Sequence, residues 1–189
     1  MSAKKDSASK KRRPAVAKRR GQETRADRVE ATGSQAAKRA AEAELTTLIA
    51  RHAPTHQRLI SAIRRVLRQR LPTAYEIVYE YDNLGAVVIS FSPSEQGYEG
   101  VLAIRATAEG VKLYFNQGKD LPDPEKLLQG SAGARWIPVD DAATLKQPAV
   151  TSLIDEAIGR TKVPFADAGR GSVVIQSTSA KKGKRSRTD

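Results

Sequence analysis

The chain has 189 residues, contains no cysteine and carries a formal net charge of +12. The absence of cysteine excludes disulfides, thiolate metal sites and cysteine nucleophiles. No apolar run approaches the roughly 18 residues that a membrane-spanning helix needs, and the basic N-terminus is not followed by the apolar segment of a secretory signal. We therefore expect a cytoplasmic protein with no membrane partner.

The positive charge is concentrated at the two ends of the chain. Residues 1–44 hold 13 Lys and Arg against 6 Asp and Glu, and residues 166–189 hold 6 against 2, whereas residues 45–165 hold 14 against 13. The sequence therefore predicts a nearly neutral folded domain over residues 34–165. A basic disordered tail precedes it (residues 1–33), and a C-terminal arm with a second basic disordered tail follows it (residues 166–189).

The tails contain dense clusters of Lys and Arg and few large aliphatic side chains. Clusters of this kind bind polyanions by releasing counterions, without reading base sequence. A tail that only keeps the protein soluble is the alternative. The predicted contacts with nucleic acid or another polyanion are Lys10, Lys11, Arg12, Arg13, Lys18, Arg19, Arg20, Lys181, Lys182, Lys184, Arg185 and Arg187.

Two helices are expected before the first strand. Ser34 suits the N-cap of a helix that runs toward Arg51, and Pro54 ends or kinks that helix. A second helix over residues 55–70 has apolar positions that recur with the helical period. Its arginines lie away from the apolar stripe and predict a basic outer surface; they are Arg58, Arg64, Arg65, Arg68 and Arg70.

The following segment has the pattern of a small β-sheet. Strands over residues 75–81, 86–92, 101–107 and 111–115, joined by turns, predict an antiparallel meander, and residues 135–139 predict a short edge strand. A further helix is expected from Pro148, and residues 173–175 either add a short strand or dock as an arm. The predicted fold class is α+β, with a sheet of about four to five strands and helices packed on one face.

Aromatic and basic residues on the strands are the candidates for ligand contact. Tyr75, Tyr79 and Tyr81 share one face of the first strand. Core packing is the favoured use of such positions, and stacking on nucleic-acid bases is the alternative. On the fourth strand two polar side chains lie opposite the apolar positions. The candidate ligand-binding residues are Tyr81, Lys112, Tyr114, Gln117, Lys119, Arg135 and Trp136.

Several segments resemble, in chain order, the YdhG-like domains of unknown function. They are YEYDNLGAVVI at residues 79–89, VKLYFNQG at 111–118, LPDPEKLLQG at 121–130, ARWI at 134–137, PAV at 148–150 with LI at 153–154, and SVVIQSTSAKK at 172–182. The resemblance spans residues 45–182 and implies a small α+β fold with a C-terminal arm and a basic terminus. One branch of that family is linked to frataxin-like iron handling, which makes an iron-binding chaperone one alternative function.

The residues themselves assign no metal ligand and no catalytic group. Iron chaperoning needs clustered carboxylates, whereas the acidic residues here are scattered along the chain. His52 and His56 have the spacing of a helical metal pair, but Pro54 lies between them and no third ligand is evident. Two polar residues at a helix junction are the favoured interpretation. No cofactor is therefore assigned, with iron kept as the alternative.

The sequence favours a non-enzymatic binding or accessory module whose basic tails contact nucleic acid or another polyanion. The alternatives are the iron chaperone implied by the resemblance, a small-molecule-binding protein, and an enzyme whose catalytic residues are not recognisable.

Overall fold

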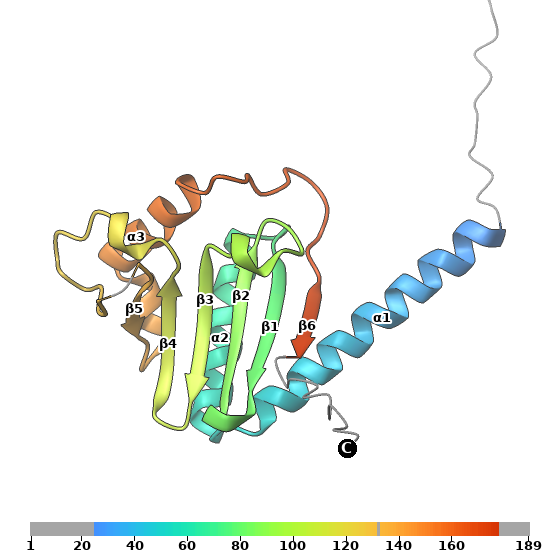
Figure 1. Ribbon diagram of the computed structural model, residues 1–189, viewed down its shortest axis with the longest axis horizontal. Helices are drawn as coiled ribbons and strands as arrows, with labels where there is room; N and C mark the ends of the chain where they lie inside the picture. Colours follow the sequence, from blue (N-terminus) through green and yellow to red (C-terminus); the bar gives the residue numbers. More distant parts are fainter. Residues whose placement is uncertain (1–24, 132, 178–189) are drawn as a thin grey trace, which may run out of the picture.

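The computed structural model describes residues 25–131 and 133–177, with side chains from residue 34 to residue 176. Helices α1 (Arg25–Ala50), α2 (Pro54–Arg70) and α3 (Pro148–Gly159) pack on one face of a six-stranded sheet (Figure 1). The strands are β1 (Tyr75–Tyr81), β2 (Ala86–Ser92), β3 (Leu102–Thr107), β4 (Gly110–Phe115), β5 (Arg135–Pro138) and β6 (Val173–Ser177). The predicted α+β class is confirmed.

The strand order in the sheet is β5-β4-β3-β2-β1-β6. β1 to β5 form the predicted antiparallel meander, whereas β6 pairs in parallel with β1. A parallel partner requires a crossover, and the segment after α3 supplies it by passing over the end of the sheet (Figure 1). The described sheet thus has six strands rather than four to five, and it continues beyond residue 165, where we had placed the end of the domain.

The helix before Pro54 is longer than predicted. α1 begins at Arg25, nine residues before the expected N-cap at Ser34, so residues 25–33 of the predicted tail are helical. A single glycine at Gly33 does not stop the helix, since it costs only about 1 kcal/mol relative to alanine. The N-terminal half of α1 projects beyond the β6 edge of the sheet (Figure 1). The predicted polyanion contacts at residues 10–13, 18–20 and 181–187 lie outside the described residues.

One hydrophobic core fills the space between the helices and the sheet. α2 crosses behind the central strands and contributes Ile60, Ile63 and Leu67, at the positions that the helical period predicts. The largest side chains with almost no exposed surface are Phe91, Phe115, Leu45, Ile60, Ile63, Leu67, Ile77, Ile89, Leu102, Ile104, Leu113 and Leu145.

A buried carboxylate joins α2 to the sheet. Glu76 of β1 is 3% exposed and accepts a hydrogen bond from Nε of Arg64 at 2.6 Å and another from Arg68. Glu42 of α1 completes the cluster by accepting from Nη2 of Arg64 at 3.0 Å and by pairing with Arg68. Two carboxylates and two guanidinium groups therefore balance one another at the junction of three elements.

The ionisation of the cluster follows from these contacts. Burial alone would raise the pKa of Glu42, but the hydrogen bonds from Arg68 and Arg64 outweigh it, so the pKa of Glu42 is lowered. Burial opposes the charged form of Arg68 as well, yet Glu42 and Glu76 raise the pKa of that guanidinium further. Both groups are therefore held in their charged forms.

The arginines of α2 do not form the free basic surface that the sequence predicted. The side chain of Arg64 is only 13% exposed, and Nη1 of Arg70 pairs with Oδ1 of Asp155 in α3 at 2.5 Å. Arg68 belongs to the cluster above, so only Arg58 and Arg65 remain exposed without an ion pair among the described residues. The periodicity placed these arginines off the apolar stripe, but it does not show that carboxylates of other elements flank that stripe.

The same contacts reverse the predicted orientation of β1. Because Glu76 and Val78 face the helices, the tyrosines of β1 face the other side of the sheet. Tyr75, Tyr79 and Tyr81 are all partly exposed, so the favoured prediction that they pack in the core is wrong.

We predict that Glu76→Gln lowers the free energy of unfolding by about 3 kcal/mol, because it leaves the guanidinium of Arg64 buried without a full counter-charge. Glu42→Gln should cost about 1 kcal/mol, since its carboxylate is half exposed and Glu76 remains in place. Urea unfolding at pH 7 measures both changes, and equal losses would contradict the ranking.

Acid should reduce the Glu42 contribution selectively. The pKa of Glu42 in the folded chain lies below its ordinary value of 4.5, so its stabilisation is complete above that value and disappears as the pH falls through the folded-state pKa. The difference in unfolding free energy between the native chain and Glu42→Gln should therefore shrink between pH 6 and pH 3. A difference that stays constant over this interval would contradict the pairing.

We also predict that Gly171→Ala loosens β6. The backbone N–H of Gly171 donates to the carbonyl of Pro72 at 3.1 Å, which holds residue 171 close to the segment before β1. A Cβ added at residue 171 would overlap the carbonyl of Ala74 in that segment. The expected cost is about 2 kcal/mol, with faster hydrogen exchange along β6. Gly159→Ala is the control, because a Cβ there meets nothing within 4 Å; similar losses in both variants would contradict the steric argument.

Candidate functional site

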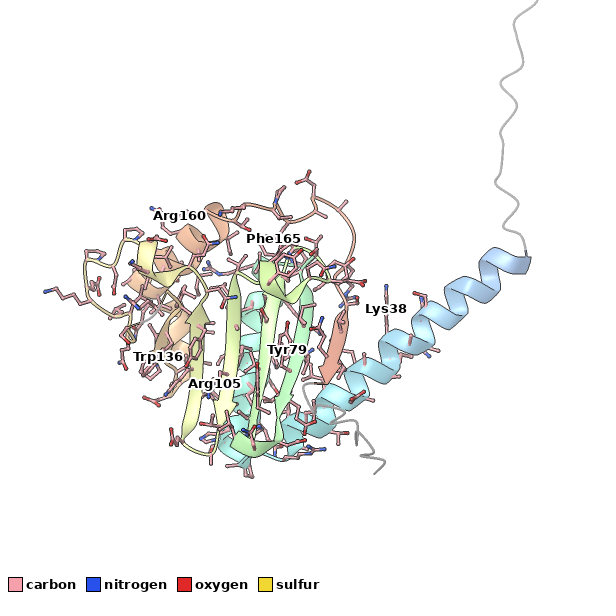
Figure 2. The ribbon with its side chains drawn as sticks, viewed as in Figure 1. Lys38, Tyr79, Arg105, Trp136, Arg160 and Phe165 are labelled. Atoms are coloured by element: carbon pink, nitrogen blue, oxygen red, sulfur yellow. The ribbon has the colours of Figure 1, made fainter. Side chains whose placement is uncertain are left out.

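The side of the sheet away from α1, α2 and α3 is here called the open face, and none of these three helices covers it. Figure 2 looks onto this side, with Tyr79, Arg105 and Trp136 spread across it. The strand register assigns to it Tyr75, Ile77, Tyr79, Tyr81, Ala86, Val88, Ser90, Ser92, Ala103, Arg105, Thr107, Lys112, Tyr114, Trp136, Pro138, Val174 and Gln176.

One end of the open face lies under the loop between β2 and β3, which contains the short 3-10 helix η2 (Gly97–Glu99). A Cβ on Gly97 would overlap the hydroxyl of Tyr79, and a Cβ on Gly100 would overlap Oγ of Ser90. The loop therefore lies directly on the sheet there, and Ile77 and Ser90 are buried. Seven of the residues that remain exposed or partly exposed form what we call the basic–aromatic patch: Tyr79, Tyr81, Val88, Arg105, Lys112, Tyr114 and Trp136.

Aromatic rings and cations lie side by side within this patch. Nζ of Lys112 lies 4.1 Å from the centroid of the Trp136 ring, a cation–π distance. The rings of Tyr114 and Trp136 have centroids 6.4 Å apart and planes tilted by 33°. Nη1 of Arg105 reaches the hydroxyl of Tyr114 at 3.5 Å, which is long for a hydrogen bond. Lys112 thus lies over an aromatic ring, and Arg105 lies beside the hydroxyl of another.

The two cations are also direct cross-strand neighbours. Arg105 of β3 is opposite Lys112 of β4, and like charges in that position destabilise a sheet. No strand position that the register assigns to the open face carries Asp or Glu, and neither cation has an ion pair within the described part of the chain. The strand carboxylates on the helix side, Glu76 and Glu80, are by contrast paired with arginines. An anionic ligand on the open face would relieve this repulsion.

Tyr79 stands at the other end of the patch, on β1. Burial raises the pKa of its phenol, and the neighbouring Tyr81 raises it further. The hydroxyl therefore stays protonated at neutral pH and can both donate and accept a hydrogen bond.

The structure separates the seven predicted ligand-binding residues into two groups. Tyr81, Lys112, Tyr114 and Trp136 lie on the open face, although Tyr81 on β1 is four strands, or about 19 Å, from Trp136 on β5. Gln117, Lys119 and Arg135 do not lie there. Gln117 lines a cavity at the end of the sheet, Lys119 is exposed in the short 3-10 helix η3 (Gly118–Asp120), and Arg135 packs against Gly118.

Arg105 and Tyr79 are members of the patch that the sequence analysis did not select. Arg105 could have been selected from the predicted hairpin around residues 108–110. Symmetric pairing across that hairpin places residue 105 opposite residue 112, which was a predicted ligand-binding residue. Tyr79 was missed because the orientation of β1 depends on the contacts of Glu76 with arginines of another element, α2.

The described residues hold no group of three or more His, Asp or Glu side chains that could bind a metal ion. Several of the acidic residues have structural partners. Glu80 pairs with Arg51, Asp141 accepts from the backbone N–H of Ala143 at 3.0 Å, and Asp123 accepts from those of residues 127 and 128. The iron alternative therefore gains no ligand set from this part of the chain.

His52 lies in the break between α1 and α2, and His56 lies in the first turn of α2. α1 ends at Ala50 and α2 begins at Pro54, so His52 and His56 do not share a continuous helix. Burial lowers the pKa of His52, and the proximity of His56 lowers it further. The junction is held by Gln57, whose Nε2 donates to the carbonyl of His52 at 2.7 Å. These contacts fit a structural junction.

No family model, curated protein or solved structure matches the chain. The resemblance to YdhG-like domains therefore stays a prediction. None of the helices between residues 25 and 177 combines the length and apolarity needed to cross a bilayer.

We predict that adjacent aromatic residues of β4 differ sharply in their effect on stability. Phe115→Ala should cost about 4 kcal/mol, because Phe115 is fully buried in the core. Tyr114→Ala should cost about 1 kcal/mol, because its ring lies partly exposed on the open face. Urea unfolding measures both; a loss of 3 kcal/mol or more for Tyr114→Ala would show that the patch is structural.

Proposed function

We propose that this protein is a non-enzymatic binding module for single-stranded nucleic acid, with bases stacking on the basic–aromatic patch and the basic tails adding affinity for phosphate. The observation that carries the proposal is the Arg105–Lys112 pair. Two cations face each other across strands on a side of the sheet that offers them aromatic rings and no carboxylate. Such repulsion within a fold is typical of a site whose ligand supplies the opposite charge.

The arrangement of rings supports a single-stranded ligand. Trp136 and Tyr114 lie together on β5 and β4, while Tyr79 lies three strands away on β1, about 15 Å across the sheet. Arg105 of β3 and Lys112 of β4 lie in the same cross-strand row as Tyr79, next to the row of Tyr114 and Trp136. Proteins that bind single strands combine such stacking platforms with positive charge that follows the backbone. A duplex hides its base faces and would use the charges without the rings.

The tails supply the second part of the proposed affinity. The predicted contacts at residues 10–13, 18–20 and 181–187 would neutralise phosphates without reading sequence, so their contribution should fall steeply with salt. The patch would contribute stacking, which depends less on ionic strength. Membership of the YdhG-like family is compatible with this proposal but does not carry it.

The test is binding of a fluorescein-labelled thymidine oligonucleotide to the full chain, at low and at physiological salt. We expect Arg105→Gln with Lys112→Gln to weaken binding about tenfold more than the matched pair Arg65→Gln with Lys146→Gln. The control pair removes the same charge from exposed positions in the helix layer. Trp136 is the only tryptophan, so its fluorescence should fall as bases stack.

The tails are tested in the same assay. Glutamine at residues 10–13 should weaken binding and flatten its dependence on salt, because fewer counterions are released. The role of the patch would be overturned if the Arg105 and Lys112 changes did not weaken binding and if Trp136 emission stayed unchanged. All affinity would then be assigned to the tails.

A further inference from the structure

A second candidate site is a cavity of about 310 Å³ at the end of the sheet that η2 covers. Three segments form its walls: the η2 loop, the segment after β4 that contains η3, and the chain that leaves the C-terminus of α3. Arg160 marks this last segment in Figure 2. The size lies at the lower end of the range for small-molecule sites. The cavity shares no lining residue with the basic–aromatic patch.

Hydrogen bonds brace the three walls against one another. Nδ2 of Asn116 donates to the carbonyl of Gly100 at 2.6 Å and joins the end of β4 to the η2 loop. Nη1 of Arg160 donates to the carbonyl of Asp120 at 2.8 Å and joins α3 to η3. Arg160 is itself held by Glu156, through Nε at 2.9 Å. A cavity held in this way loses little conformational entropy when a ligand binds.

The cavity has an apolar lining with exposed hydrophobic groups at its border. Val101, Leu121 and Ala157 contribute apolar surface inside. Tyr98 is 83% exposed and Val163 37%, and these are two of the four large hydrophobic side chains that the described residues leave exposed. Their convergence on one cavity indicates a surface that an apolar group covers.

Charges of both signs surround this apolar lining. Arg160 and Lys162 come from the segment after α3, while Glu99 and Asp120 come from η2 and η3. Glu99 is oriented by the hydroxyl of Ser94, and the guanidinium of Arg160 keeps donors beyond the two already used. Two carboxylates beside two cations disfavour a polyanion and suit a small ligand that carries one charge of each sign.

From this combination we propose that the cavity binds a small zwitterion with an apolar body, of the kind represented by an α-amino acid with an aromatic or aliphatic side chain. The ligand carboxylate pairs with Lys162 and Arg160, its ammonium group pairs with Asp120 and Glu99, and its side chain covers Val101, Ala157 and Val163. This inference is independent of nucleic-acid binding by the open face.

The test is a titration of the full chain with phenylalanine, followed through the methyl NMR signals of Val101 and Val163. We expect saturable shifts of both signals. Two analogues with one charge each, 3-phenylpropionate and 2-phenylethylamine, should bind at least tenfold more weakly. Lys162→Gln and Asp120→Asn should each weaken phenylalanine binding about fivefold, whereas Lys146→Gln, an exposed lysine outside the cavity lining, should leave it unchanged.

The outcomes separate this proposal from the previous one. Absence of saturable shifts, or an analogue that binds as tightly as phenylalanine, would overturn the zwitterion site. The site would also be overturned if Lys146→Gln weakened phenylalanine binding as much as Lys162→Gln does. Such a result would show that the effect depends on net charge alone. Arg105→Gln with Lys112→Gln should leave phenylalanine binding intact, so that either site can fail alone.

Discussion

The carboxylate of Glu76 determines which face of β1 is turned toward the helices. A buried carboxylate is costly unless charged partners surround it, and the partners available are Arg64 and Arg68 of α2. Once β1 turns Glu76 toward α2, the pleat turns Tyr75, Tyr79 and Tyr81 the other way. The exposure of the three tyrosines on the open face therefore follows from one ion cluster in the helix layer.

The regular elements were predictable because their signals are local. α2 and the four strands of the hairpins appear within one residue of the expected bounds, since each has a clear period and a turn beside it. β6 was harder to predict because its parallel partner, β1, lies almost a hundred residues earlier in the chain. The start of α1 was missed because Ser34 has the chemistry of a cap but lies inside a continuing helix.

The candidate sites were only partly predictable, for a related reason. Lys112, Tyr114 and Trp136 could be grouped from the sequence because they lie on neighbouring strands with a simple alternation. The place of the β1 tyrosines depends on the ion pairs of Glu76 with Arg64 and Arg68, which belong to a different element, α2, and on Glu42 of α1, more than thirty residues earlier in the chain. Periodicity gives two faces for a strand, whereas the choice between them is a property of the tertiary structure.

The η2 loop connects the two candidate sites physically. Gly97 lies against the hydroxyl of Tyr79 on the open face, whereas the next residue, Tyr98, lines the cavity. Gly100 covers Ser90 and also accepts the hydrogen bond from Asn116. Because Gly97 and Gly100 have no side chains, the η2 loop can lie close to the sheet and border both the open face and the cavity.

The parallel docking of β6 determines where the basic C-terminal sequence begins. Ser177 pairs with Glu80, the residue before Tyr81, so the chain continues from a point one strand away from the tyrosines of the open face. Because β6 is hydrogen-bonded along its length to β1, its C-terminal end is held at a fixed place beside β1. A charged group joined to the end of β6 by a short linker would therefore be held at high effective concentration near Tyr79 and Tyr81, whatever the concentration of protein in solution. The N-terminal sequence enters instead at the far end of α1, beyond the edge of the sheet (Figure 1). Groups attached at the two ends of the described chain are therefore unequal in their reach to this surface.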